Sequence, residues 1–312
     1  MDILAQALEL GLVTRTEVER GLVAAGPGAG TGQRVVALRG RIVATVREAA
    51  PSAPIAHERA ALEALAADDL AAPVLPSTDG RLWTAALAGR TLAELSAAHH
   101  WAPTAGDSAL ADLTAGCVAL GTSLAAVHRL PADRRPRPDV PCTAISTRSV
   151  RNARDTALGA EIRHALDADR GIRVAAETVR ERWSDRNWTI GRIAPENVSV
   201  DVFWRARFTD LGSAGLGDPD WDVAACLASI ALVADSVPAT VAWLSEHFWN
   251  SYRRCGGPGR VRPQMQAMYA IDAAWRAADP AAQDAGGGPR VRWWLDRAHR
   301  VVARTSVQGL AA

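Results

Sequence analysis

The sequence predicts an α+β protein with a β-rich N-terminal part and a larger helical C-terminal part. Two apolar runs, Gln33–Leu38 and Arg41–Arg47, flank Arg39-Gly40 and are typical of a β-hairpin. Between residues 108 and 130, apolar side chains recur every three or four positions, which indicates a helix with one buried face. Further helices are predicted over 174–183, 222–233, 237–254, 264–278 and 291–307.

The N-terminal part begins with a short helical pattern over 3–10. Thr14 and Glu17 then have the spacing of a capping box for a second helix. A glycine-rich run at 26–32 follows; such runs occur in ordinary hairpins as well as in loops whose backbone N–H groups cover phosphates. Short strands are predicted at 73–76 and 82–87, and we expect Trp83 to be a core residue.

Composition limits the function classes. The chain has 312 residues, a mass of 33.0 kDa and 48% hydrophobic residues, enough for one large bilobal domain or two smaller ones. A net charge of +1 argues against a general nucleic-acid binder. All 35 basic residues are Arg, which together with abundant Ala indicates the composition of a GC-rich, actinobacterial-like genome.

Neither cysteines nor apolar segments suggest a secreted or membrane protein. Cys117, Cys142, Cys226 and Cys255 are far apart and form no CxxC pair, so buried free thiols are expected rather than a metal site. The N-terminus lacks a basic segment before an apolar one, and no apolar run is long enough to span a bilayer. These observations predict a cytoplasmic protein without a membrane partner.

The most informative stretch runs from 188 to 225. It contains Gly191-Arg192-Ile193-Ala194-Pro195-Glu196-Asn197-Val198, then Thr209-Asp210-Leu211-Gly212, then Gly217-Asp218-Pro219-Asp220-Trp221-Asp222. In this order, and with the LGTSLAAVH helix ending at His128, the stretch resembles aminoglycoside phosphotransferases and other protein-kinase-like small-molecule kinases. The resemblance implies a bilobal kinase-like fold with a small lobe at 1–88 and a helical lobe at 89–312.

The resemblance also implies roles for the site residues. Asn197 and Asp210 match the positions that hold magnesium, Glu58 matches the glutamate of the small-lobe helix, and Arg47 stands where the phosphate-binding Lys belongs. The position of the catalytic Asp is occupied by Arg192. A guanidinium cannot act as a general base, so no catalytic residue is assigned. These exchanges leave open whether ATP and Mg²⁺ still bind.

Three further residues are expected to be structural. The resemblance makes Asp218 and Asp222 carboxylates that fix the backbone of the catalytic-type loop. His128, at the end of the predicted core helix, is expected to be packed and hydrogen-bonded rather than catalytic.

The first functional hypothesis is a pseudokinase-like subunit that binds a peptide or a partner enzyme. The N-terminal layout resembles the kinase-like proteins of ribosomal-peptide biosynthesis of the thioamitide and class V lanthipeptide type, which work with a lyase. A basic segment at 133–138 and four further arginines are candidates for docking an acidic peptide: Arg148, Arg151, Arg154 and Arg163.

The second hypothesis is an active phosphotransferase that acts on a small molecule or on peptide Ser and Thr with rearranged residues. Asp185 or Glu196 would then supply the missing carboxylate. Arg47 or Arg192 would supply the contact with phosphate.

Overall fold

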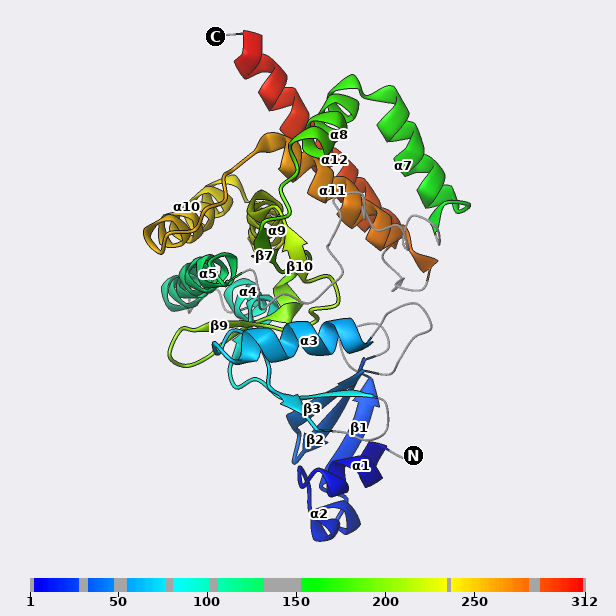
Figure 1. Ribbon diagram of the computed structural model, residues 1–312, viewed down its shortest axis with the longest axis vertical. Coiled ribbons are helices and arrows are strands. Elements are labelled where there is room, and N and C mark those ends of the chain that lie inside the picture. The colour runs from blue at the N-terminus through cyan, green and yellow to red at the C-terminus, as the bar shows by residue number, and fades with distance from the viewer. Residues whose placement is uncertain are drawn as a thin grey trace.

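The computed structural model describes residues 3–27, 33–47, 55–76, 81–101, 106–131, 153–234, 237–280 and 287–310. Within them, a small lobe built around a sheet lies at one end of an elongated molecule, and a larger lobe of helices lies at the other (Figure 1). The α+β, kinase-like architecture predicted from the sequence is confirmed. The lobe boundary at residue 88 stays a prediction.

The small lobe contains an antiparallel sheet with strand order β1-β2-β3-β5-β4. Its strands are β1 (Val23–Pro27), β2 (Gln33–Leu38), β3 (Arg41–Arg47), β4 (Val74–Leu75) and β5 (Leu82–Ala85). The β2–β3 hairpin is closed by Arg39 and Gly40, whose φ values are +51° and +77°. Positive φ at both central residues is the turn geometry that follows the twist of paired strands. The predicted hairpin is therefore confirmed.

Short helices cover the outer part of this sheet. They are α1 (Ile3–Glu9) and α2 (Arg15–Glu19), and α3 (Ile55–Ala66) lies between the sheet and the large lobe (Figure 1). The capping box is present, because Glu17 N donates to Thr14 Oγ1 at 3.3 Å and Thr14 N donates to Glu17 Oε2 at 2.9 Å. Trp83 is fully buried in the small-lobe core beside Val36 and Val46, as predicted.

The chain enters the large lobe through β6 (Arg90–Thr91), which pairs with β8 (Val198–Val200). Gly89 precedes this strand with φ +126°, and a Cβ on it would lie 2.1 Å from the carbonyl oxygen of Val200. Only glycine fits this close approach without displacing the backbone. The connection between the lobes is thus held against the strand that follows the catalytic-type loop.

The large lobe is a set of packed helices behind two small sheets. The helices are α4 (Leu92–Trp101), α5 (Gly106–His128), α7 (Ala157–Ala168), α8 (Arg170–Arg182), α9 (Pro219–Val233), α10 (Pro238–Arg254), α11 (Pro263–Ala278) and α12 (Gly287–Leu310). The sheets are β6-β8-β9, with β9 at Ala206–Phe208, and β7 (Asn187–Thr189) paired with β10 (Gly215–Gly217). Helix α9 is buried on nearly every face, as its apolar sequence predicts.

One expectation about membranes needs correction. By length and composition alone, the helix Ser108–His128 is apolar enough to cross a bilayer, whereas no such run was expected. In the structure, 56% of its most apolar window is buried, and α4 and α10 pack against it. It is the central core helix of the large lobe, and the cytoplasmic location stays a prediction.

Candidate functional site

Three predicted site residues meet between the lobes. Arg47 at the end of β3 places Nη1 2.8 Å from Glu58 Oε2 on α3 and Nη2 2.6 Å from Asp210 Oδ1, which follows β9. Glu58 also accepts a hydrogen bond from the backbone of Leu211. Asp210 has φ +58°, a left-handed conformation that is uncommon for a non-glycine residue and concentrates at functional sites. The small lobe therefore contacts the Asp210 turn through both side-chain and backbone atoms.

Burial and charge shift the pKa values of this cluster. Burial raises the pKa of Glu58 to about 7, although the charge of Arg47 opposes this and that of Asp210 adds to it. Burial also acts to raise the pKa of Asp210, but the nearby guanidiniums of Arg47 and Arg192 outweigh it and lower that pKa. At neutral pH Asp210 is therefore ionised, while Glu58 holds its proton more tightly than an ordinary glutamate does.

Arg192 occupies the loop position of the expected catalytic carboxylate. Its Nη1 lies 3.4 Å from Asp210 Oδ2, and 41% of its side chain is exposed. The carboxylate of Asp210 therefore has one guanidinium from each lobe, Arg47 from the small and Arg192 from the large. Because a guanidinium stays protonated, neither arginine can act as a base for an attacking hydroxyl.

Asn197 lies beside this cluster at the end of a 3₁₀ turn, Pro195–Asn197. Its Oδ1 accepts a hydrogen bond from Ala194 N at 2.7 Å, and its carbonyl oxygen accepts one from Thr209 N at 2.9 Å. The amide is buried, with 6% of the residue exposed. The two residues predicted to bind metal are thus held on adjoining segments of backbone, and their function as metal ligands stays a prediction.

A magnesium ion, which the kinase-like fold implies, does not fit the residues present. Within the described residues, no group of three or more His, Cys, Asp or Glu side chains gathers here, so Asp210 would be the carboxylate ligand and Asn197 the amide ligand. Asn197 Oδ1 already accepts a hydrogen bond, and both oxygens of Asp210 face arginines at 2.6 and 3.4 Å. A dication would be repelled by these fixed positive charges and would have to displace them from its one carboxylate ligand.

The backbone of the catalytic-type loop is held by Asp222, as predicted. Its carboxylate accepts hydrogen bonds from Ile190 N at 2.6 Å and Gly191 N at 2.8 Å. His128 Nε2 lies 3.1 Å from the same carboxylate, and Tyr252 Oη lies 2.7 Å from His128 Nδ1. Both contacts of the ring form hydrogen bonds in the Nε2–H tautomer, in which Nε2–H donates to Asp222 and the tyrosine hydroxyl donates to Nδ1. His128 is accordingly a buried hydrogen-bonded residue rather than part of the cleft.

Asp218 was expected to hold the backbone of the catalytic-type loop, but its contacts lie elsewhere. Its carboxylate caps α9 by accepting a hydrogen bond from Asp220 N at 3.0 Å, and it also accepts one from the backbone of Ser184. The loop is instead held by two residues that the sequence analysis missed. Trp221 Nε1 donates to Gly191 O at 2.8 Å, and Tyr269 Oη donates to Ile193 O at 3.0 Å.

Arg276 is a third residue that sequence reasoning missed. It forms an ion pair with Asp272 on the same helix, and its guanidinium lies 5.1 Å from the ring centre of Tyr269. Its charge contributes to the low pKa of Asp210. The only sequence signal was a pair of opposite charges, Asp272 and Arg276, four positions apart in a mostly apolar helix, and nothing local connects that helix with the cleft.

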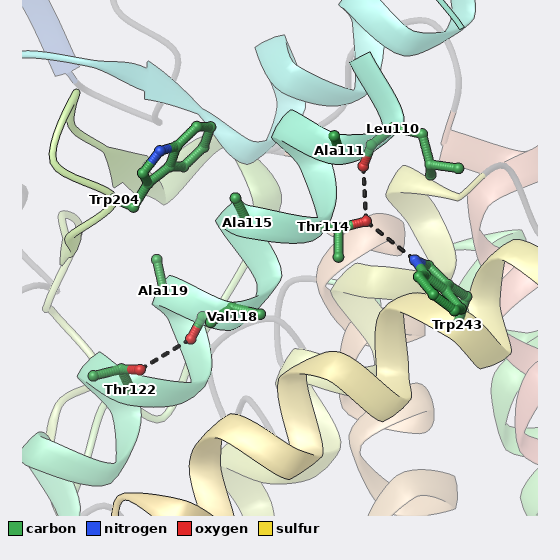
Figure 2. Close-up of a pocket in the computed structure, with 9 residues that line it drawn as sticks. All are labelled: Leu110, Ala111, Thr114, Ala115, Val118, Ala119, Thr122, Trp204 and Trp243. Atoms are coloured by element: carbon green, nitrogen blue, oxygen red, sulfur yellow. Dashed lines mark hydrogen bonds between the residues drawn. The ribbon is translucent and has the colours of Figure 1, made fainter. Parts of the chain in front are cut away.

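A second feature is an apolar groove on the large lobe (Figure 2). It has a volume of about 630 Å³ and lies over α5, between Trp204 and Trp243. Thr114 Oγ1 accepts a hydrogen bond from Trp243 Nε1 at 3.2 Å. The remaining lining residues are small or aliphatic: Leu110, Ala111, Ala115, Val118, Ala119 and Thr122.

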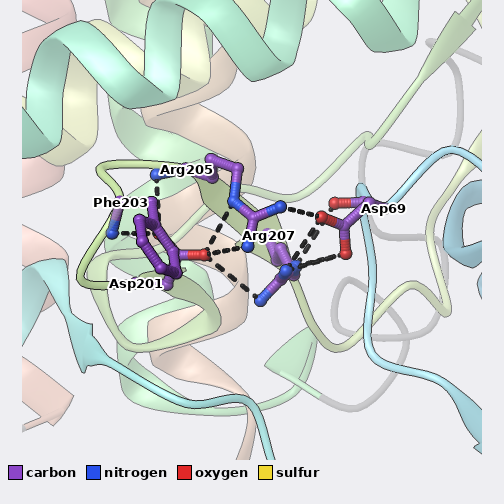
Figure 3. A network of polar contacts seen from close by, with 5 residues as sticks. All are labelled: Asp69, Asp201, Phe203, Arg205 and Arg207. Atoms are coloured by element: carbon purple, nitrogen blue, oxygen red, sulfur yellow. Dashed lines mark hydrogen bonds and ion pairs between the residues drawn. The ribbon is translucent and has the colours of Figure 1, made fainter.

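Trp204 belongs to the β8–β9 hairpin, whose tip is held by a network of acids and arginines (Figure 3). Asp201 Oδ1 accepts hydrogen bonds from the backbone of Phe203 at 2.8 Å and of Arg205 at 3.0 Å. Arg205 Nη1 and Arg207 Nη2 then contact the carboxylate of Asp69 at 2.7 and 2.8 Å. At the tip, Val202, Phe203 and Trp204 are 82%, 75% and 43% exposed.

Other predicted features fall outside the site or outside the described residues. Asp185 and Glu196 are both exposed. Arg163 contacts the carbonyl of Arg154 on the surface. Most of the glycine-rich run, at 28–32, and the basic segment with Arg148 and Arg151 lie outside the described residues.

Comparison with solved structures agrees with this fold. The choline kinase LicA from Streptococcus pneumoniae is 12% identical, with a TM-score of 0.61 over 93% of this chain and 96% of that one. The choline kinase from Cryptosporidium parvum Iowa II is 10% identical, with a TM-score of 0.62 over 98% and 96%. The aminoglycoside phosphotransferase APH(4)-Ia is 17% identical, with a TM-score of 0.60 over 93% and 99%.

At these identities the likeness establishes a fold shared with choline kinases and aminoglycoside phosphotransferases, and nothing finer. One similar structure is LicA in complex with AMP. No protein-family model matches the chain, and no curated protein matches it.

Proposed function

We propose that this chain is a pseudokinase-like binding protein, which uses the kinase fold for recognition rather than for phosphoryl transfer. The observation that carries the proposal is the guanidinium of Arg192, 3.4 Å from Asp210 Oδ2, at the loop position where the fold places its base. Phosphoryl transfer in this fold needs a carboxylate there to orient the attacking hydroxyl. An arginine supplies the opposite charge and accepts no proton.

The position of Arg47 supports the same proposal. Both of its terminal nitrogens are engaged, one by Glu58 at 2.8 Å and one by Asp210 at 2.6 Å. A lysine would reach phosphate as a point charge, whereas this planar fork is directed at two carboxylates. The small-lobe cation therefore joins the lobes instead of standing free for a nucleotide.

The expected occupant, a peptide or a partner enzyme such as a lyase of ribosomal-peptide biosynthesis, stays a prediction. The groove between Trp204 and Trp243 supports a binding role, since its volume of about 630 Å³ is within the usual range of ligand sites. Val202 and Phe203, next to Trp204 at the hairpin tip, add exposed apolar surface beside the groove.

The test is a phosphotransfer assay with ATP and Mg²⁺ on choline, an aminoglycoside and Ser/Thr peptides. We expect no transfer by the wild-type protein. We also expect no gain in the variant Arg192→Asp, because position 47 still lacks a lysine. Transfer by the wild-type protein that disappears in Asp210→Ala would overturn the proposal.

An active phosphotransferase is the second candidate. One observation favours it: the basic residue of β3 and the acid of α3 form the ion pair that an active kinase requires, with Arg47 Nη1 2.8 Å from Glu58 Oε2. Glu196, adjacent to Asn197, or Asp185 would then act as base. This candidate predicts that the wild-type protein has a measurable transfer activity and that Glu196→Gln or Asp185→Asn abolishes it. Glu177→Gln, at an exposed position on α8, removes the same charge and is the control.

A further inference from the structure

We infer that the cleft binds a phosphoryl or similar oxyanion group without a metal ion, with Arg192 as its principal contact. This rests on the proposed function, because metal-dependent transfer requires a cation where these arginines lie. In the kinase fold, a metal ion bridges the Asp of this turn and the phosphates. Here, guanidinium groups take over the positive charge.

The guanidinium of Arg192 has N–H donors that no side chain within the described residues engages. Only its Nη1 is engaged by a side chain within the described residues, at 3.4 Å from Asp210 Oδ2, and 41% of the side chain is exposed. The guanidinium has five N–H donors in a rigid fork that matches two oxygens of a phosphate. Nε and Nη2 therefore remain to bind an oxyanion in the cleft.

The surroundings keep this guanidinium in place. Asp210 holds it from one side, and the loop that carries it is anchored by Asp222 through Gly191 N at 2.8 Å. The carbonyl of Arg192 lies 3.5 Å from Asn197 Nδ2. A preorganised cation loses less conformational entropy on binding than a free surface arginine does.

The charge balance of the cleft also favours an anion. Arg47, Arg192 and Arg276 surround Asp210, and the first and last have acids of their own, Glu58 and Asp272. Arg192 has no acid of its own within the described residues, and it shares the carboxylate of Asp210 with Arg47, which lies 2.6 Å from Oδ1. An oxyanion in the cleft would be attracted by the guanidinium of Arg192, whereas a dication would be repelled by it.

The experiment is a calorimetric titration of inorganic pyrophosphate into the full chain, first in EDTA and then in Mg²⁺. We expect binding in EDTA that Mg²⁺ does not strengthen and that rising salt weakens. Arg192→Gln should lower the affinity about tenfold or more, since a hydrogen bond to a charged group is lost. Arg182→Gln is the matched control, an exposed arginine in the last turn of α8, and should leave the affinity unchanged.

Parallel titrations distinguish the source of the phosphoryl group. Tighter binding of ADP than of pyrophosphate assigns it to a nucleotide, and tighter binding of a phosphoserine peptide assigns it to a peptide. Circular dichroism and the unfolding midpoint check that Arg192→Gln is folded. Absence of binding in EDTA, binding that requires Mg²⁺, or equal losses in both variants overturn the inference.

The two proposals fail separately. Phosphate transfer from ATP in the presence of Mg²⁺ would overturn the proposed function whatever the titrations show. A cleft that neither transfers phosphate nor binds pyrophosphate would overturn this inference alone, because the proposed function requires only that Arg192 does not act as a base.

Discussion

The guanidinium of Arg47 in the small lobe and the carboxylate of Asp210 in the large lobe form an ion pair of 2.6 Å across the cleft. The two residues are 163 positions apart in sequence. Both side chains are mostly buried, with 17% and 20% exposed, so water screens their attraction only in part. This contact and the neighbouring pair with Glu58 connect the small lobe to the large lobe across the cleft.

Removing Arg47 should therefore destabilise the fold. In Arg47→Met, the carboxylates of Glu58 and Asp210 lose their shared partner, and we expect the free energy of unfolding to fall by about 3 kcal/mol. Urea denaturation measures this difference. Arg41→Met, in the same strand at an exposed position, should change it by less than about 0.5 kcal/mol. Equal effects of the two substitutions would show that the ion pairs of Arg47 do not contribute to the free energy of unfolding.

The raised pKa of Glu58, about 7, predicts a dependence of stability on pH. Between the ordinary carboxyl pKa and about 7, the folded protein binds this proton more tightly than the unfolded chain does. The contribution of Glu58 to the free energy of unfolding therefore falls as the pH rises through that window. Glu58→Gln, which cannot ionise, should gain stability relative to wild type over the same window, by about 1.4 kcal/mol for each pKa unit.

Thermal or urea unfolding at several pH values measures this effect. Glu63→Gln is its control, because Glu63 is exposed on the same helix. A stability difference between Glu58→Gln and wild type that does not change with pH would contradict the raised pKa.

Gly89→Ala should be more destabilising than Gly40→Ala. Both glycines have positive φ, +126° and +77°, but only the Cβ at position 89 would meet backbone, at 2.1 Å from Val200 O. Gly40→Ala should cost about 1 kcal/mol, the strain of a left-handed alanine. Gly89→Ala adds the displacement of the segment between the lobes, for a total of roughly 3 kcal/mol or more. If denaturant unfolding gives the same loss of stability for both variants, the contact of the Cβ with Val200 O does not contribute.

Asp222→Asn should loosen the catalytic-type loop. An amide has one acceptor oxygen and would present N–H donors to Ile190 N or to His128 Nε2. We expect faster hydrogen exchange at the amides of Ile190 and Gly191, together with a loss of about 2 kcal/mol of stability. Asp296→Asn, at an exposed position on α12, should change neither quantity. Unaltered hydrogen exchange at both amides would show that the Asp222 carboxylate does not hold the loop in place.

The apolar hairpin tip should be dispensable for folding. Phe203 is 75% exposed, and Phe203→Ala should alter the free energy of unfolding by less than about 0.5 kcal/mol. Phe208 lies in β9 of the same hairpin and is only 1% exposed, so Phe208→Ala should lower the free energy of unfolding by about 3 kcal/mol or more. A large stability loss in Phe203→Ala would mean that the tip is part of the fold rather than a free apolar surface.

Features set by neighbouring residues were predictable from the sequence. The Thr14 and Glu17 capping box, the Arg39-Gly40 hairpin turn and the buried α9 each depend on a few consecutive residues. The order of the loop, the Asp210 turn and the α9 start also indicated the fold. A resemblance of this kind places residues such as Arg47 and Asp210 in one cleft.

The contacts that those residues make could not be predicted in the same way. Whether Arg47 extends to Asp210 depends on the separation of the two lobes, which no sequence pattern encodes. Arg276 and Tyr269 act on the loop region from a helix whose sequence indicated only a packing role. The groove arises where α5, α10 and the hairpin tip converge, so its apolar lining is invisible as a motif.

The carboxylate of Asp69 connects the cleft with the groove. Asp69 follows α3, the helix that carries Glu58, and it pairs with Arg205 and Arg207 of the hairpin that bears Trp204. The next residues continue this attachment, because Phe208 N donates to Leu70 O at 2.9 Å. The segment after α3 therefore ties a helix at the cleft to the hairpin at the groove.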